Sequence, residues 1–373
     1  MSQAKKILFL CPYPQNTAPS QRLKYEQYFT SFEQDGFQLC VSPFIIMPFW
    51  NILYKKGYWF QKVFYTIIGY FRRIYDLFRI RRYDIVYVHL WVTPLGFHLF
   101  EMMVCLLAKK VVYDMDDMIF LGHASYANKP LKFLKGKIKI IYLLKKADFV
   151  ITSTKALEDF AKEFNNHVID IPTSIDVNKY KLKENYNIQK TMVLGYSGSH
   201  STLKYLKSIE PVFEQLLQRG VDFKVLVVSN STFSFNNKNI PTEVRYWSLA
   251  DEQHLLHQMD VGLYPLTDEP WVYGKRGGKA LLYMAVGLPI IATAIGSNLD
   301  TFVDGTNGFL IPVGDNDKWV SRIIELKDNL SLRQSLGQQA RKTIEERFSV
   351  EANKEWYLKV LNAVLKDKLS ESS

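Results

Sequence analysis

The segment best suited to chemistry is a glycine-rich, cationic stretch, YPLTDEPWVYGKRGGKALLYMAVGLPIIAT, at residues 264–293. Its centre opens a predicted helix with Gly274, Lys275, Arg276, Gly277, Gly278 and Lys279. Mobile backbone and cations at a helix N-terminus suit a diphosphate, and without an anion these cations would oppose the helix dipole. The P-loop pattern fails, because Tyr273 stands where its first glycine would be and Ala280 replaces its Ser or Thr. We predict an anion site here, with a solvated basic turn as the alternative.

A second glycine turn lies at residues 194–206, in LGYSGSHSTLKYL. The pattern indicates a strand, a turn at Gly198 and Ser199, and then a helix that carries Lys204 one turn in. A helix start of this kind can hold a phosphate through its free N–H groups. Because glycine turns before helices are common, an ordinary turn is the alternative.

Clustered carboxylates follow a third apolar run, VVYDMDDMIF at residues 111–120. Asp114, Asp116 and Asp117 could bind a metal, act as a base, or cap the structure that follows. His89 ends another predicted strand, and a histidine in that position is more often structural than catalytic. The sequence leaves these alternatives open.

The elements that must position these residues alternate regularly between strand and helix. The predicted strands span residues 6–11, 38–42, 85–89, 110–113, 149–152, 167–171, 192–196, 224–228, 244–247, 261–264 and 289–293. Amphipathic helical stretches lie between them, as at residues 203–219, 250–258, 279–285 and 318–329. This alternation predicts parallel sheets that are covered on both faces.

A polar linker near residues 172–190 divides the pattern in two. We therefore predict an α/β protein of two doubly wound, Rossmann-like domains that face a cleft, at residues 1–172 and 190–350. In such sheets ligands bind at the carboxyl ends of the strands.

The positive charge is concentrated in the first part of the chain. Residues 1–150 hold 21 Lys/Arg and 10 Asp/Glu, or +11, whereas residues 151–373 hold 26 and 27, or −1. Two segments, 55–82 and 118–147, carry most of the excess and mix cations with aromatic and aliphatic residues at helical spacing. Such segments suit amphipathic helices on an anionic membrane. The alternatives are a solvated helix face and, less favoured because no nucleic-acid module accompanies the charge, nucleic acid.

Other bulk features exclude several classes of protein. The three cysteines are far apart and have neither metal-knuckle nor disulfide-framework spacing. The N-terminal apolar run is too short for a signal peptide. The most apolar stretch, 85–108, is broken by polar residues, Pro and Gly, so we expect strand, turn and helix there and a soluble or peripheral protein.

Several of these segments together resemble the family 4 retaining glycosyltransferases, which have a B-type fold of two Rossmann domains. The most specific match is KALLYMAVGLPIIATAIGSNLDTFVDGTNGFLIPVGD at 279–315, with MDVGLYPL at 259–266 before it. Moderate matches lie at 6–29, 147–160 and 171–180, so the resemblance covers nearly the whole chain. In the family, a final helix, here at about 350–373, packs back on the first domain.

The resemblance implies a nucleotide diphosphate sugar held mainly by the second domain. It places Lys204 and Lys279 against the diphosphate and the nucleobase near Ser229 and Arg245. It also places Ser20 and Arg22 toward the cleft. It implies no metal and no cofactor, because cations do the work of stabilising the leaving diphosphate.

The sequence departs from the family at two glutamates that usually stand eight residues apart. Their positions here are Gly274 and Leu282, so Asp268 or Glu269 is expected to hold the donor sugar instead. Asp116 takes the place of the usual histidine after the VVY strand, and we expect it to orient or deprotonate the acceptor.

We therefore expect retaining transfer from a UDP- or GDP-sugar to a hydroxyl of a lipid-linked or surface-polysaccharide acceptor, by a cytoplasmic enzyme peripheral to the inner face of the plasma membrane. The acceptor side would include His89 with Ser20 and Arg22. The missing glutamates motivate a non-catalytic nucleotide-sugar-binding or scaffold subunit as the alternative. A dinucleotide-dependent oxidoreductase is disfavoured, because GxGxxG with its acidic ribose ligand is absent.

Overall fold

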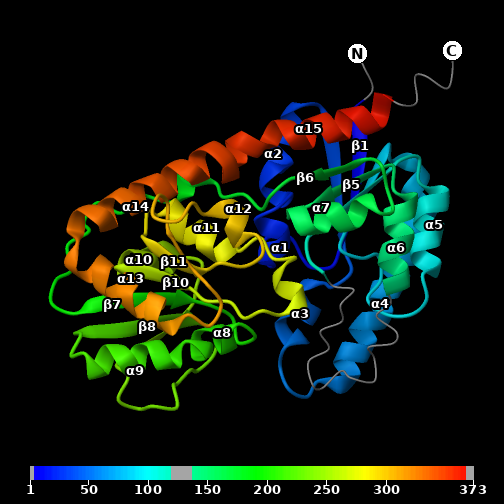
Figure 1. The fold of residues 1–373 in the computed structure, drawn as a ribbon. Helices are drawn as coiled ribbons and strands as arrows, with labels where there is room; N and C mark the ends of the chain where they lie inside the picture. Colours follow the sequence, from blue (N-terminus) through cyan, green and yellow to red (C-terminus); the bar gives the residue numbers. More distant parts are fainter. Residues whose placement is uncertain (1–3, 119–136, 367–373) are drawn as a thin grey trace. The chain divides into compact units, whose positions relative to one another are not determined.

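A computed structural model describes residues 4–118 and 137–366 of the chain. The chain forms two compact units, the first made of Met1–Thr173 and Asn353–Ser373 and the second of Ser174–Ala352. Each unit is built around its own six-stranded parallel sheet (Figure 1).

The sheet of the first unit has the strand order β2-β1-β3-β4-β5-β6. Every side chain of β3 and β4 is buried, as a parallel sheet covered on both faces requires. The predicted strands are confirmed, with small shifts at their ends. Their bounds are Lys5–Cys11 (β1), Phe37–Pro43 (β2), Ile85–His89 (β3), Val111–Met115 (β4), Phe149–Thr152 (β5) and Val168–Asp170 (β6).

Helices cover both faces of this first sheet. Alternate β1 residues separate the two layers. Leu8 and Leu10 belong to an apolar cluster with residues of α5, α6 and α7, whereas Phe9 stacks on Tyr25 and lies tilted against Tyr87. The helices of this unit are Pro19–Arg22 (α1), Phe29–Gln34 (α2), Met47–Leu53 (α3), Trp59–Arg79 (α4), Leu99–Leu107 (α5), Lys137–Lys146 (α6) and Lys155–Lys162 (α7), with 3₁₀ turns at Glu26–Tyr28 (η1) and Ile80–Arg82 (η2).

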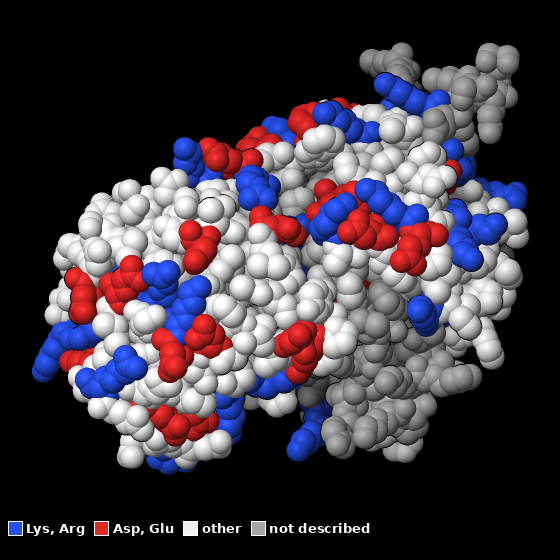
Figure 2. Space-filling model, in the orientation of Figure 1, with Lys and Arg blue, Asp and Glu red and all other residues white. Residues whose placement is uncertain are grey.

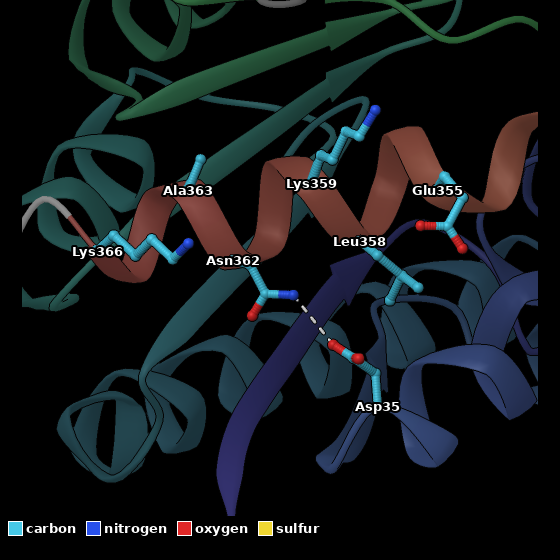
Figure 3. Close-up of a pocket in the computed structure, with 7 residues that line it drawn as sticks. All are labelled: Asp35, Glu355, Leu358, Lys359, Asn362, Ala363 and Lys366. Atoms are coloured by element: carbon cyan, nitrogen blue, oxygen red, sulfur yellow. Dashed lines mark hydrogen bonds between the residues drawn. The ribbon is translucent and has the colours of Figure 1, made fainter.

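The last described helix, α15 (Val350–Lys366), packs on α2 and β1. The ring of Tyr357 lies 4.6 Å from that of Tyr28, and Asn362 bonds to Lys5 and Asp35. Figure 3 shows the shallow hollow between this helix and Asp35. None of its lining residues belongs to a predicted site.

The second sheet has the order β12-β11-β10-β7-β8-β9, which is the 3-2-1-4-5-6 order of dinucleotide-binding folds. The predicted strands of this half are also confirmed. The edge strand β12 has only three residues, and the sequence analysis did not predict it. The bounds are Met192–Ser197 (β7), Phe223–Ser229 (β8), Thr242–Tyr246 (β9), Val261–Tyr264 (β10), Ile290–Thr293 (β11) and Phe309–Ile311 (β12).

The helices of the second unit depart from the prediction in one place. The stretch 203–219, predicted as a single helix, is two helices that meet at Ile209, with Pro211 in the first turn of the second. Because a helix tolerates proline only in its first turn, the prediction of one continuous helix was wrong. The helices are Leu203–Ser208 (α8), Glu210–Gln218 (α9), Glu252–His257 (α10), Gly278–Ala285 (α11), Asn298–Thr301 (α12), Asn316–Asp328 (α13) and Leu330–Thr343 (α14).

Each sheet has a point at which the strand order reverses. It lies between β1 and β3 in the first unit and between β7 and β10 in the second. Loops that leave the carboxyl ends of such strands diverge, which opens the usual ligand position of doubly wound folds. The predicted glycine turns follow β7 and β10, and Asp116 follows β4, so the sheet order brings the candidate residues to these edges.

Among the described residues, none of the helices has the length and apolar character that crossing a bilayer would need. On the face of the second unit seen in Figure 2, lysines and arginines lie among aspartates and glutamates, as its near-zero formal charge predicts.

Candidate functional site

The turn after β7 has little room for side chains. A Cβ atom on Gly198 would lie 2.3 Å from the Tyr196 ring and 2.9 Å from the Thr202 hydroxyl. The Gly198 N–H donates to the Val228 carbonyl of β8 at 2.9 Å, which holds the turn against the neighbouring strand. The turn continues to Leu203, where the six-residue helix α8 begins. The helix therefore starts at the predicted residue, but it has only six residues, and Lys204 is its second residue and does not lie one turn in.

Lys204 of α8 meets the loop after β10 at the switch point. Its Nζ lies 2.6 and 2.9 Å from the two carboxylate oxygens of Glu269, and 4.6 Å from the centroid of the Trp271 ring. The structure thus brings together two residues that the sequence proposed separately. Because Lys204 is half exposed, the pair remains open to exchange with an incoming anion.

Lys279, in the first turn of α11, has no carboxylate partner among the described residues. Its Nζ donates to the Thr202 hydroxyl at 2.6 Å and lies 5.6 Å from the centre of the Tyr196 ring. Burial lowers the pKa of Lys279 to about 7, and the nearby Lys275 adds to this effect. An ammonium group held in this way, without a counter-ion, is suited to an anionic ligand.

The backbone before α11 also suits an anion. Gly277 has φ +74° and precedes the helix without any side-chain cap, so the first N–H groups of α11, from Gly278 onward, are not capped by a side chain. A Cβ on Gly277 would be strained by this φ and would lie 3.1 Å from the Tyr264 hydroxyl. Glycine is therefore required where the chain enters the helix.

Other predicted donor residues take different surroundings. Arg276 is buried, with its guanidinium 5.9 Å from the centroid of the Phe348 ring. Asp268 accepts from the Tyr273 hydroxyl at 3.0 Å. Arg245 is exposed on the edge strand β9 and pairs with Glu243 at 2.6 Å. The charge of Lys275 acts on Lys279 and helps to lower the pKa of its ammonium group.

In the first unit, three polar side chains surround the buried carboxylate of Asp114. Lys24 lies 2.5 Å from one of its oxygens, and the Tyr87 hydroxyl donates to the other at 2.7 Å. His89 Nδ1 is 3.3 Å from that second oxygen, because β3 and β4 align His89 directly with Asp114. Burial by itself would raise the pKa of Asp114, but Lys24 and His89 outweigh it and hold the pKa at about 2.

Asp116 lies just beyond the end of β4 and keeps partial access to solvent. Its carboxylate is 14% exposed and 3.8 Å from Lys24 Nζ, and its carbonyl accepts from Ser153. Burial raises the pKa of Asp116 to about 6, although Lys24 and His89 oppose this rise. The neighbouring Asp117 accepts from the Met118 N–H at 2.7 Å. Of the three aspartates, Asp116 is thus the one suited to exchange a proton near neutral pH.

The loop after β1 is held by a buried glutamine that the sequence analysis did not single out. Gln21 accepts from the Tyr13 N–H and donates to the Tyr13 carbonyl and to Glu26. Glu26 in turn accepts from the Asn16 N–H at 2.9 Å. Ser20 and Arg22, the predicted acceptor-side residues, flank Gln21 on the four-residue helix α1 and are half-buried.

His89, the third predicted acceptor-side residue, is fully buried, and its Nε2 has no hydrogen-bond partner among the described residues. Nowhere in residues 4–118 and 137–366 do three His, Cys, Asp or Glu side chains converge as metal ligands do. Lys24, Thr202 and Trp271 were missed from the sequence. No sequence pattern around Lys24 marks it as a site residue, and only its contact with Asp114 in the structure identifies it.

Two Rossmann-type sheets, with cations and glycine turns at the switch point of the second, are the architecture of the B-type glycosyltransferase fold. Residues 191–329 match the family model of Glycosyl transferases group 1. The resemblance noted from the sequence is thereby confirmed.

Relatives and solved structures agree with this assignment. The capsular polysaccharide biosynthesis glycosyltransferase CapM of Staphylococcus aureus is 26% identical over 267 residues, which are 64% of this chain and 69% of CapM. The N-acetyl-alpha-D-glucosaminyl L-malate synthase of Bacillus anthracis is 25% identical over half of each chain.

Solved structures share the fold at low identity. HepE of Anabaena, in complex with UDP, has a TM-score of 0.67 at 15% identity and covers 96% of this chain and 100% of its own. Sucrose-phosphate synthase of Thermosynechococcus elongatus has a TM-score of 0.70 at 14% identity, covering 97% of this chain and 100% of its own.

Proposed function

We propose that this glycosyltransferase transfers a sugar from a nucleotide diphosphate sugar to a hydroxyl group of a lipid-linked or surface-polysaccharide acceptor, with retention of configuration. The observation that carries the proposal is Lys279, a cation without a carboxylate partner among the described residues, at the switch point of the second sheet. UDP is the favoured nucleotide, since the fold neighbour HepE was solved with UDP and with UDP-glucose.

The donor's diphosphate lies, in this proposal, between Lys204 and Lys279. Glu269 pairs with the Lys204 ammonium group in the free protein. When the diphosphate replaces Glu269 as the partner of this ammonium group, the Glu269 carboxylate becomes available to bind a sugar hydroxyl. This exchange gives Glu269 the contact that a family glutamate at the Gly274 or Leu282 position would supply. Trp271 keeps the lysine in place by a cation–π contact.

The chemical step breaks the bond between the anomeric carbon and the diphosphate oxygen and forms a bond from that carbon to the acceptor oxygen. Attack on the face of the departing diphosphate preserves the configuration, and a phosphate oxygen takes the acceptor's proton. Lys204, Lys279 and the uncapped start of α11 stabilise the charge that develops on the leaving group. These groups can do this work without a resident metal or cofactor.

The first unit, in this proposal, presents the acceptor. Asp116, as a carboxylate, accepts a hydrogen bond from the acceptor hydroxyl and orients it for attack, whereas the buried Asp114 positions Lys24 and His89. Ser20 and Arg22 contact the acceptor from the clamped loop after β1. The similarity to CapM, a glycosyltransferase of capsular polysaccharide biosynthesis, supports a glycan-assembly acceptor.

Calorimetric titration with UDP, GDP and NAD, on wild type and on Lys279→Ala, tests the donor assignment. We expect one nucleoside diphosphate to bind and Lys279→Ala to weaken it about 10- to 100-fold, the worth of a charged hydrogen bond. Lys207→Ala, an exposed lysine on the same helix as Lys204, is the matched control and should bind as wild type does. Binding of none of the three nucleotides would reject the donor site and favour a scaffold role.

A further inference from the structure

The outer face of α4 is apolar, and no other element in the described part of the chain covers it. Phe60, Phe71 and Phe78 are 92%, 66% and 86% exposed, and the same face carries five more exposed residues of this kind, which are Val63, Phe64, Ile67, Ile74 and Tyr75. We call these eight residues the α4 stripe. Soluble proteins seldom expose so many large apolar side chains together, and such a patch marks an interaction surface.

The spacing of the stripe makes it one continuous band. At about 100° of rotation per residue, all eight positions fall within roughly 120° of the helix circumference. A helix of 21 residues is about 30 Å long, and the band runs from its first turn to its last. The band is therefore long, narrow and straight.

The opposite side of α4 attaches the helix to the first unit. A Cβ on Gly69 would lie 2.6 Å from the Phe44 ring, so the helix backbone rests directly on that ring. The buried Arg73 donates to the carbonyls of Val92, Ser42 and Cys11 and pairs with Asp76. These contacts fix which side faces outward, so the stripe is not a core face awaiting a rotation of the helix.

Cations bracket the stripe at both ends. Lys55 and Lys56 precede α4, and Arg81 and Arg82 follow it, all four exposed. The single acid of residues 55–82 is Asp76, which is buried and bonded to Arg73, Arg79 and Ser42. Within residues 55–82 the accessible charge is therefore wholly positive.

We propose that the α4 stripe is an interfacial membrane anchor that lies in the headgroup region of an anionic phospholipid bilayer, with the helix axis parallel to the surface. An amphipathic helix in this position buries its apolar face about 5–10 Å deep. The terminal cations contact anionic headgroups, which attract juxtamembrane Lys and Arg. Aromatic residues such as Tyr75, and Trp59 at the start of the helix, favour the interface itself.

Charge and shape favour lipid over other occupants. Nucleic acid would need exposed cations along the centre of the surface. The centre of the stripe is aliphatic and aromatic, and the cations of residues 55–82 that are classed as exposed stand at its ends. The basic helix α6 contributes less than its sequence suggested, because Lys139 is buried and its Nζ bonds to Thr93 and to the Leu95 carbonyl, 3.5 Å from Glu101. Lys129, Lys132 and Lys135 lie outside the described residues.

This inference deepens the proposed function by naming the surface that brings the enzyme to a lipid-linked acceptor, and in that purpose it rests on the proposal. Its physical basis is independent, because a vesicle-binding assay needs neither donor nor acceptor. Loss of nucleotide binding and loss of vesicle binding are thus separate results.

The test is co-sedimentation of the full chain with vesicles of phosphatidylglycerol and phosphatidylcholine, and with vesicles of phosphatidylcholine alone. Wild type should bind the anionic vesicles, less so in high salt. Phe60→Ser with Phe71→Ser and Phe78→Ser should lower the partition coefficient about a hundredfold or more. Replacing Arg81 and Arg82 by Gln should lower it about fivefold per charge.

The matched control replaces three exposed apolar residues of the second unit by serine, namely Leu299, Val313 and Leu330. This control should bind vesicles as wild type does, and every variant should keep the wild-type circular dichroism, because all replaced side chains are exposed. The proposal that the α4 stripe is a membrane anchor would be rejected if the wild type did not bind anionic vesicles. Equal binding by the stripe variant and the control variant would reject it as well. So would a wild-type dimer, seen by sedimentation velocity, that the stripe variant converts to monomer, since the stripe would then meet a second copy.

Discussion

Lys279 should make donor binding depend on pH in an unusual range. Burial and Lys275 lower the pKa of its ammonium group to about 7, from an ordinary 10.5. The free protein therefore loses this cation as the pH rises through 7. A bound diphosphate stabilises the charged form, so binding above pH 7 must take up a proton.

The magnitude follows from this pKa. At pH 8, one unit above it, about a tenth of the free protein carries the charge, and restoring the charge costs about 1.4 kcal/mol. Affinity for a nucleotide diphosphate sugar should be level below pH 7 and should fall up to about tenfold per pH unit above it. The fall ends where the pKa of the complex is reached.

Calorimetry with UDP-glucose between pH 6 and 9, repeated in buffers of different ionisation enthalpy, measures both the affinity and the proton uptake. A nucleotide sugar is the correct probe because its diphosphate is esterified at both ends and does not titrate in this range. Lys279→Arg stays charged throughout and should bind without pH dependence. Affinity that is flat with pH in wild type, or an equal fall in Lys279→Arg, would refute the reasoning.

Three further predictions concern single positions. Asp116→Asn should reduce kcat at least a hundredfold with an unchanged donor Kd. The kcat of the wild type should rise with pH through about 6 as this carboxyl ionises. A variant with wild-type turnover would show that Asp116 takes no part in the reaction. Lys24→Met should destabilise the protein by about 3–5 kcal/mol at pH 8, because the buried Asp114 carboxylate loses its cationic partner. The loss should be smaller at pH 5, where the Asp114 carboxyl can take up a proton. Equal losses of Tm at both pH values would contradict this. Gly198→Ala, whose Cβ would meet the Tyr196 ring, should cost about 1–3 kcal/mol and weaken donor binding. Gly220→Ala has space for its Cβ but a φ of +65°, so it should also cost stability while leaving donor affinity unchanged.

Local pattern was enough to locate most of the fold. Buried parallel strands read as short apolar runs, so β3, β5 and β10 were placed to the residue. The two helices at 203–219 were joined because the periodicity continues across Ile209, and only Pro211 signals the break. The short strand β12 carries too few residues to give a pattern.

The candidate site divides in the same way. Glycines and cations after β7 and β10 pointed to Gly198, Lys204 and Lys279 because their chemistry is local. Their partners are not local: Thr202 lies 77 residues from Lys279, and Glu269 lies 65 from Lys204. Similarly, nothing near Lys24 indicates that it meets Asp114, 90 residues away.

By itself, the sequence determined the alternation of strand and helix, the two glycine turns, and the charge asymmetry between the halves of the chain. These follow from residue type and short-range spacing, which dictate burial and backbone freedom wherever the segment lies. Only the tertiary structure decided which charges are paired, as with Arg73 and Lys139, and which side of α4 stays uncovered. An apolar pattern says that a face avoids water, but what covers that face depends on contacts between elements far apart in the chain.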